Sequence, residues 1–171
     1  STANPFSDTL AVDLVDELAA VFAGRGDLTE TAGTRGIYVA HHDQPRPFTN
    51  LDGLLTDSTL HAWAGTGCAP EDCPDETPKL TFAEGVADSF LGAWTDDDRQ
   101  VAVDEVIPGG NGMLPDFIVP TEFKNLHYVA VKDPGDDPDY GGLDWYTWYV
   151  YFTYENDVPV VLGMSIDAWA P

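Results

Sequence analysis

The sequence predicts an α+β fold in which two main helices pack on a strongly curved, mainly antiparallel sheet of about six strands. Two segments repeat apolar residues at helical spacing, and about six shorter ones, most of them in the second half, have strand character. A length of 171 residues suits one domain with a sizeable core. We therefore expect residues 1–171 to form a single globular domain.

The first helix is predicted over residues 8–24. Ser7 can cap its N-terminus, Asp8 suits the positive end of the helix dipole, and Gly24 stops it. Leucines four residues apart, followed by a valine, form one apolar stripe along it. This pattern is typical of a helix that faces the core.

The next part of the chain combines short elements with loops. A polar loop is predicted over 25–35, a short strand over 36–40, and an extended or turned segment with two prolines over 43–48. A short helix over 50–57 and a strand over 59–63 then lead into a proline-containing loop.

The second main helix is predicted over residues 82–94, where Thr81 and Glu84 supply a capping box. Strands are predicted over 100–107 and 126–132. The glycine-rich loop between them lacks the Lys-Ser/Thr pair of a phosphate-binding loop, which argues against nucleotide binding.

The chain closes with a predicted hairpin of strands 145–155 and 158–166, joined by a tight turn at Asn156-Asp157. Both alternating faces of its first strand carry aromatic residues. We therefore expect both faces of the sheet to be covered, one by the helices and the other by sheet curvature or a ligand cleft.

The charge balance is strongly acidic. Thirty acidic residues stand against seven Lys and Arg, which gives a formal net charge of −23. Such a surface repels phosphate backbones and anionic lipids, so nucleic acid is excluded as a partner, and the absence of a long apolar run argues against a membrane span. The composition is typical of a solvated surface, as in a halophilic protein, with calcium binding or a basic partner as alternatives.

Only two cysteines occur, Cys68 and Cys73. Four intervening residues suit a disulfide that closes a short surface loop, whereas a zinc site would need four ligands and no second cysteine pair is present. A disulfide implies an oxidising compartment, so we expect an extracellular or cell-surface location.

Several segments from residue 36 to the C-terminus carry a resemblance. They read GIYVAHHDQPRPF, TLHAWAG, DEVIPGGN, HYVAVKDPGDDPDYGGLDW and VPVVLGMSIDAW, of which GG-x-DW and the D-x-W ending are the most distinctive. Together they resemble a domain of secreted and lipoprotein-type bacterial proteins to which no activity is assigned. The resemblance implies an extracellular setting and no particular reaction. By architecture alone, a curved sheet wrapped round helices is similar to the NTF2-like fold.

An acidic loop precedes the closing hairpin. Oxygen ligands as dense as those of Asp133, Asp136, Asp137 and Asp139 could hold Ca²⁺, although their spacing is not that of an EF-hand. A solvated turn is the alternative. The sequence otherwise indicates no cofactor at this loop.

The open end of the hairpin is the main candidate site. Asp144 lies about 12 residues before the turn and Asp167 about 11 after it, so both should reach the same end, beside Trp145 and Trp169. Two carboxylates near aromatic rings are typical of glycosidases, which makes Asp144, Asp167 and His42 the catalytic candidates. The alternative is that the aspartates cap strand ends and the tryptophans belong to the core.

The four histidines form a third candidate group. His41 and His42 are adjacent, so on a strand they point to opposite faces and do not easily share a metal. His61 and His127 lie on other predicted strands and could approach either of them, giving a metal site or a general base. Local hydrogen bonding of each histidine is the alternative.

Three functional hypotheses follow from these patterns. The favoured one is a non-enzymatic extracellular domain that binds a small molecule or a cell-envelope partner in an aromatic and acidic pocket formed by Trp63, Trp145, Trp169 and His42. The second is a small acid/base enzyme, either a carbohydrate hydrolase or an NTF2-like isomerase or dehydratase. The third is an acidic protein-interaction or inhibitory domain that recognises a basic target.

Overall fold

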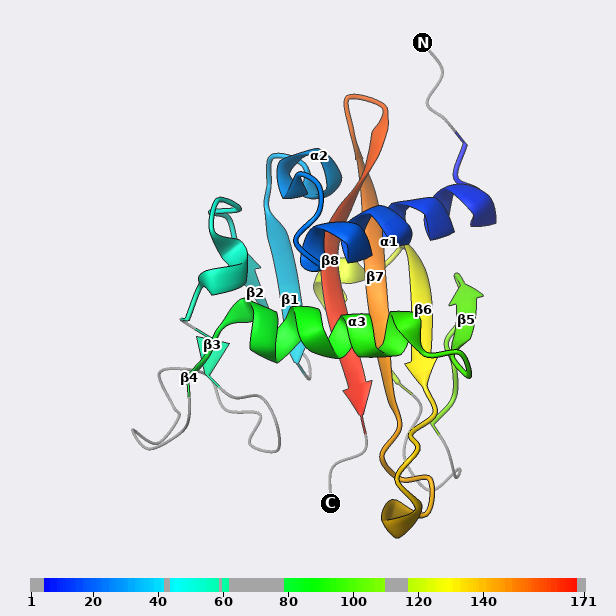
Figure 1. The fold of residues 1–171 in the computed structure, drawn as a ribbon. Coiled ribbons are helices and arrows are strands. Elements are labelled where there is room, and N and C mark those ends of the chain that lie inside the picture. The colour runs from blue at the N-terminus through cyan, green and yellow to red at the C-terminus, as the bar shows by residue number, and fades with distance from the viewer. Residues whose placement is uncertain (1–4, 42–43, 59, 62–78, 110–116, 169–171) are drawn as a thin grey trace.

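A computed structural model describes residues 5–41, 44–58, 60–61, 79–109 and 117–168. Its centre is a six-stranded sheet in the order β2-β1-β8-β7-β6-β5 (Figure 1). Neighbouring strands of this sheet are antiparallel except β1 and β8, which are parallel. This confirms the predicted mixture of helices with a mainly antiparallel six-stranded sheet, whereas the strong curvature stays a prediction.

The strands of the main sheet are β1 (Ile37–His41), β2 (Gln44–Phe48), β5 (Gln100–Val103), β6 (His127–Asp133), β7 (Tyr146–Glu155) and β8 (Val158–Ala168). A separate two-stranded sheet pairs β3 (Leu60–His61) with β4 (Lys79–Leu80). The prolines of the 43–48 segment are accommodated because β2 lies at the edge of the sheet, where a missing N–H group leaves no strand unpaired.

Helix α1 (Asp8–Phe22) begins where the sequence predicts and ends two residues earlier than predicted, before Gly24. The Ser7 hydroxyl accepts a hydrogen bond from the backbone N–H of Leu10 at 3.2 Å, which satisfies one of the free donors of the first turn. Past the helix, Gly24 has a φ of 85°, a conformation that glycine adopts without strain. The apolar stripe of α1 is buried against the sheet.

The second main helix consists of two parts, a π-helical turn η2 (Ala83–Ala87) followed by α3 (Asp88–Thr95). The Thr81 hydroxyl accepts from the N–H of Glu84 at 3.2 Å and donates to the Glu84 carboxylate at 2.9 Å, so the capping pair is present. A short helix that the sequence did not predict, α2 (Leu28–Ala32), follows α1. No helix of the described ranges is long and apolar enough to cross a membrane.

The hairpin of β7 and β8 confirms the predicted tight turn. Asn156 and Asp157 have φ values of 50° and 63°, as a two-residue turn with positive φ at both positions requires. The pairing continues to Tyr146 opposite Ala168, with one register shift beside Tyr151. The tip of the hairpin extends beyond the other strands (Figure 1).

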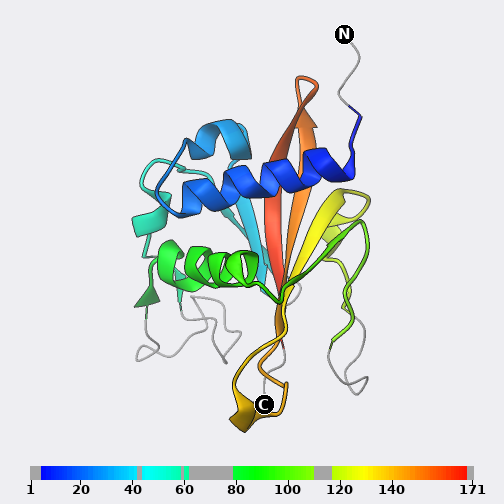
Figure 2. The same cartoon turned by 45° about the vertical axis from the view of Figure 1, so that its right-hand side comes forward.

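The sheet has two differently covered faces, and β7 contributes to both. On the first face, Trp148, Val150 and Phe152 are buried with the apolar stripes of α1 and α3, which lie side by side across the strands (Figures 1 and 2). On the second face, Tyr149 and Tyr151 are buried in a smaller cluster.

Irregular chain between β5 and β6 covers the second face. Phe117 stacks on Tyr149 with ring centroids 4.2 Å apart, and Phe123 of the 3₁₀ turn η3 (Thr121–Phe123) stacks on Tyr151 at 4.3 Å. Ile107 joins the same cluster. Both faces are covered, as predicted, but the predicted second cover, sheet curvature or a ligand cleft, is wrong, because residues between β5 and β6 pack on that face.

Candidate functional site

The open end of the β7–β8 hairpin, at the bottom of Figure 1, holds the described members of the predicted site. Asp167 lies directly opposite Thr147 in the register, and Asp144 and Trp145 come just before β7. The structure thus brings Asp144, Trp145 and Asp167 to one end of the hairpin. The other predicted residues of the site, His42, Trp63 and Trp169, lie outside the described residues, as do Cys68 and Cys73.

The Asp144 carboxylate holds the acidic loop. It accepts hydrogen bonds from the backbone N–H groups of Asp136 at 3.0 Å and Asp137 at 2.9 Å, and it lies against Gly135. The Asp137 N–H is the main cause that lowers the pKa of Asp144 below its usual value, with smaller contributions from its own N–H and that of Asp136. A general acid needs a raised pKa, so this geometry favours the loop-closing role of Asp144.

The other loop aspartates also form local turns. Asp133 accepts from the N–H of Gly135 at 2.8 Å, and Asp137 accepts from the N–H of Asp139 at 2.9 Å, which caps the short turn η4 (Pro138–Tyr140). Within the described part of the chain, no three His, Cys, Asp or Glu side chains are arranged to hold a metal ion. Calcium binding by Asp133, Asp136, Asp137 and Asp139 stays a prediction.

Trp145 is covered on several sides and is only 3% exposed. The Lys132 ammonium lies 5.1 Å from the centroid of its ring, and a Cβ atom added to Gly109 would come within 2.8 Å of the ring. A sugar-stacking platform needs an open ring face. The arrangement favours the alternative in which Trp145 packs inside the protein and supports the chain at Gly109.

A row of polar residues crosses the second face next to Trp145. Lys132 on β6, Thr147 on β7 and Asp167 on β8 are direct neighbours in the register. Lys132 and Thr147 are buried, and Asp167 is half-buried. Burial, and then the negative charge of Asp167, raises the pKa of Tyr149.

Sequence reasoning missed Lys132 and Thr147. The available signal was strand alternation, which places Thr147 between Trp145 and Tyr149 on the same face of β7. A threonine within a run of buried aromatic residues is a polar group that needs a partner.

His127 lies at the opposite end of the sheet. Its register partner is Phe152, at the far end of β7 from Thr147. Its Nδ1 atom is 2.8 Å from Asp104 Oδ2, and its ring stacks on Phe6 with centroids 4.0 Å apart. Where the chain is described, His127 therefore has local partners and does not join the open end of the hairpin.

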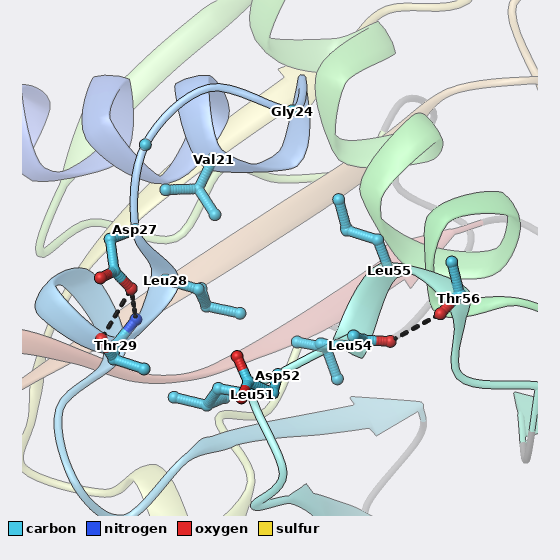
Figure 3. A pocket seen from close by; sticks show the side chains of 12 residues that line it. Val21, Gly24, Asp27, Leu28, Thr29, Leu51, Asp52, Leu54, Leu55 and Thr56 are labelled. Carbon is cyan, nitrogen blue, oxygen red and sulfur yellow. Dashed lines mark hydrogen bonds between the residues drawn. The ribbon is translucent and has the colours of Figure 1, made fainter.

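A second concave region, which the sequence did not predict, lies beside the C-terminus of α1. It is a hollow of about 490 Å³ between residues 21–29 and residues 51–56, here called the α1–η1 hollow (Figure 3). Its apolar wall combines Val21 and Leu28 from one segment with Leu51, Leu54 and Leu55 from the other. Its polar lining includes the carboxylates of two exposed residues, Asp27 and Asp52.

Local turn chemistry explains one wall of the α1–η1 hollow. Gly24 and Gly26 both have positive φ and turn the chain back after α1. Asp27 then caps α2 by accepting from the Thr29 N–H at 2.9 Å and from the Thr29 hydroxyl at 2.6 Å. These two bonds, the hydroxyl first, lower the pKa of Asp27, which therefore stays ionised.

The opposite wall is a tight turn followed by the 3₁₀ turn η1 (Leu54–Thr56). Gly53 has a φ of 71°, and the Thr56 hydroxyl donates to its carbonyl oxygen at 2.9 Å. The turn presents Leu51 and Leu55 half-buried rather than fully covered. Three leucines within five residues around a glycine could have indicated this wall. The facing segment could not be predicted, because it is distant in the sequence.

The chain was compared with protein-family models, with curated proteins and with solved structures, and none of the three comparisons found a match.

Proposed function

We propose that this protein is a binding domain whose ligand is a small organic cation with an apolar body, held in the α1–η1 hollow. The observation that carries the proposal is a hollow of about 490 Å³ with leucine and valine walls and two carboxylates in its lining. Sites for small molecules are typically concave, mostly apolar and of this size, with a few polar groups that fix the orientation of the ligand.

The apolar walls supply the attraction for the body of the ligand. Leu54 and Val21 are buried core residues in the lining, whereas Leu51 and Leu55 are half-buried and keep apolar surface in contact with water. Covering that surface removes it from water, at a gain of about 25 cal/mol for each Å². The gain requires no movement of the core.

The two carboxylates determine the charge of the ligand. Asp27 is held ionised by the two hydrogen bonds from Thr29, and Asp52 lines the opposite wall. The lining among the described residues contains no lysine or arginine that would neutralise them. A net charge of −23 also raises the local concentration of cations near the surface. An ammonium group on an alkyl or aromatic body fits these conditions.

The wider setting is part of the same proposal and rests on the sequence. The spacing of Cys68 and Cys73 supports a disulfide and an extracellular or cell-surface location. The same function could be served by the open end of the hairpin, with His42, Trp63 and Trp169. The α1–η1 hollow is preferred because Trp145, an aromatic residue of the hairpin site, is only 3% exposed and offers a ligand no open ring face.

The proposal is tested with 2-phenylethylammonium and its uncharged counterpart 2-phenylethanol as probes. Methyl signals of Val21, Leu28 and Leu54 are followed by NMR during each titration. We expect saturable shifts with the ammonium compound and weaker binding of the alcohol, because only the former is attracted by Asp27 and Asp52.

A matched pair of variants locates the effect. Asp52→Asn should weaken binding of the ammonium compound several-fold and leave binding of the alcohol unchanged. Asp13→Asn, which removes the same charge from an exposed position on α1 outside the hollow, should change neither. If neither compound shifts the methyl signals of the hollow, the proposed function is wrong.

A further inference from the structure

Three hydrogen-bond donors are buried together on the second face of the sheet, and they are here called the donor cluster: Lys132, Trp145 and Thr147. Their exposed fractions are 8%, 3% and 0%. Lys132 and Thr147 are directly opposite each other on β6 and β7, and Trp145 precedes Thr147 by two residues. The position of the Lys132 Nζ atom, 5.1 Å from the centroid of the Trp145 ring, places all three on one side of the sheet.

Among the described residues, the donor cluster has fewer hydrogen-bond partners than its members require. Lys132 Nζ donates one hydrogen bond, at 3.0 Å, to the carbonyl oxygen of Pro108, although an ammonium group has three donors. Trp145 Nε1 and Thr147 Oγ1 are buried and have no hydrogen-bond partner among the described residues. Buried N–H and O–H groups of folded proteins nearly always have a partner, which can be a bound ion or ligand.

Among the described residues, no carboxylate is seen to pair with the charge of Lys132. The ion pairs seen there include Arg35 with Glu155 and His127 with Asp104, and neither involves Lys132. A buried ammonium group is normally paired with an anion because burial removes its hydration. A cation and two unsatisfied donors in one place are the donor set of an anion site.

Three acidic residues adjoin the donor cluster and limit what the site can take. Asp144 precedes Trp145, and its Oδ2 atom accepts from the N–H groups of Asp136 and Asp137, while its Oδ1 atom is buried without a partner among the described residues. Asp167 lies on the other side of Thr147 from Lys132, one strand further along the sheet. Asp133 follows Lys132 in the chain but pairs with Tyr146, whose hydroxyl contacts Ser89 of α3 on the first face. The negative charge of Asp167 opposes a second negative charge on the ligand, whereas one compact charge beside Lys132 is compensated.

We propose that Lys132, Trp145 and Thr147 bind a small monovalent anion, either a halide ion or the carboxylate of a small acid. The two share a single compact negative charge that accepts N–H and O–H hydrogen bonds. The site is independent of the α1–η1 hollow. Because the net charge of −23 repels anions at long range, affinity has to come from the three donors at short range.

The test follows the indole N–H signal of Trp145 by NMR, assigned by its loss in Trp145→Phe. The full chain is titrated with sodium chloride and, separately, with sodium acetate, while sodium sulfate keeps the ionic strength constant. We expect a saturable shift with at least one of the two anions, and the comparison distinguishes a halide site from a carboxylate site.

Two variants and one control complete the test. Thr147→Val keeps the shape of the side chain and removes one donor, so the apparent dissociation constant should rise about tenfold. Lys132→Met should abolish saturation, whereas Lys124→Met, which removes the same charge from an exposed position, should not. The proposal is overturned if the indole signal moves with neither anion, or if it moves equally in Lys132→Met and in the unchanged protein.

Discussion

The two faces of β7 are built from one strand but differ in chemistry. On the first face the Trp148 indole N–H donates to the Ser89 hydroxyl at 3.0 Å, and its neighbours Val150 and Phe152 are apolar. On the second face Thr147 alternates with two buried tyrosines, and its hydroxyl has no partner where the chain is described. The first face is therefore mainly apolar and its indole N–H has a partner. The second face carries a buried hydroxyl without a hydrogen-bond partner among the described residues.

The type of cover explains this contrast. Carbonyl groups within a helix are occupied by the helix's own hydrogen bonds, so α1 and α3 offer the first face mainly apolar side chains. An irregular segment has free carbonyl groups, and two of them are used on the second face: Ile107 accepts from the Tyr149 hydroxyl at 3.4 Å, and Pro108 accepts from Lys132. A loop cover therefore permits polar groups on the sheet beneath it.

Replacing Trp148 by alanine should have the largest effect. The side chain is 1% exposed at the centre of the first face, so its loss leaves a cavity beneath α3 and should lower the free energy of unfolding by about 3–5 kcal/mol. Urea denaturation followed by circular dichroism measures the loss. Trp148→Phe, which fills most of the space, should cost less, and a loss under about 1 kcal/mol in Trp148→Ala would contradict the assignment of this face as the main core.

Gly163→Ala tests the packing of the second face. An added Cβ atom would lie 2.5 Å from the Phe123 ring and 2.7 Å from the backbone oxygen of Tyr38, and the backbone cannot easily give way. We expect a loss of about 1–3 kcal/mol in the free energy of unfolding, measured in the same way. Gly141→Asn serves as a control, because position 141 is open and asparagine tolerates its φ of 59°. Unchanged stability of Gly163→Ala would show that Phe123 is not held tightly on the sheet.

Ser165→Ala tests a polar contact of the second face that is satisfied. The hydroxyls of Tyr151 and Ser165 are 2.8 Å apart and both residues are buried, so the substitution leaves the tyrosine hydroxyl unpaired. The expected loss in the free energy of unfolding is about 1–3 kcal/mol. Adding Tyr151→Phe should recover most of it, because both polar groups are then absent, and a double variant no more stable than Ser165→Ala would argue against this reading.

Thr147→Val should change the free energy of unfolding least of the four substitutions, and it can raise this free energy where the others lower it. Because the Thr147 hydroxyl has no partner in the described structure, its replacement by a methyl group should change the free energy of unfolding by less than about 1 kcal/mol, or raise it, in a buffer poor in small anions. The comparison with Ser165→Ala uses the same denaturation experiment. Equal losses in the two variants would mean that the Thr147 hydroxyl has a partner, and the contrast between the polar groups would disappear.

Local features of this protein were predictable from the sequence. The Ser7 cap, the Asn156-Asp157 turn and the alternation along β7 all depend on residues within a few positions of one another. The π-helical turn at the start of the second helix and the short helix after Asp27 were missed. Both arise in short segments, where tertiary packing outweighs weak local preferences.

The candidate sites were less predictable because they join distant segments. Asp144 was placed correctly at the open end of the hairpin, but its contact with the N–H groups of Asp136 and Asp137 depends on how the loop closes. The walls of the α1–η1 hollow meet although about 25 residues separate Leu28 from Leu54. Residue periodicity predicts the elements of the chain but not which distant segments come into contact.

The two main helices, the closing hairpin and the acidic charge balance could be read from the sequence, because capping, turn formation and side-chain alternation are short-range properties of the chain. Three features needed the folded structure: β1 pairs in parallel with β8, irregular chain covers the second face, and Lys132 lies beside Trp145 and Thr147. These contacts are chosen by the burial of surface between segments far apart in the chain. Each of these contacts depends on several distant segments at once, so no single segment of the sequence predicts it.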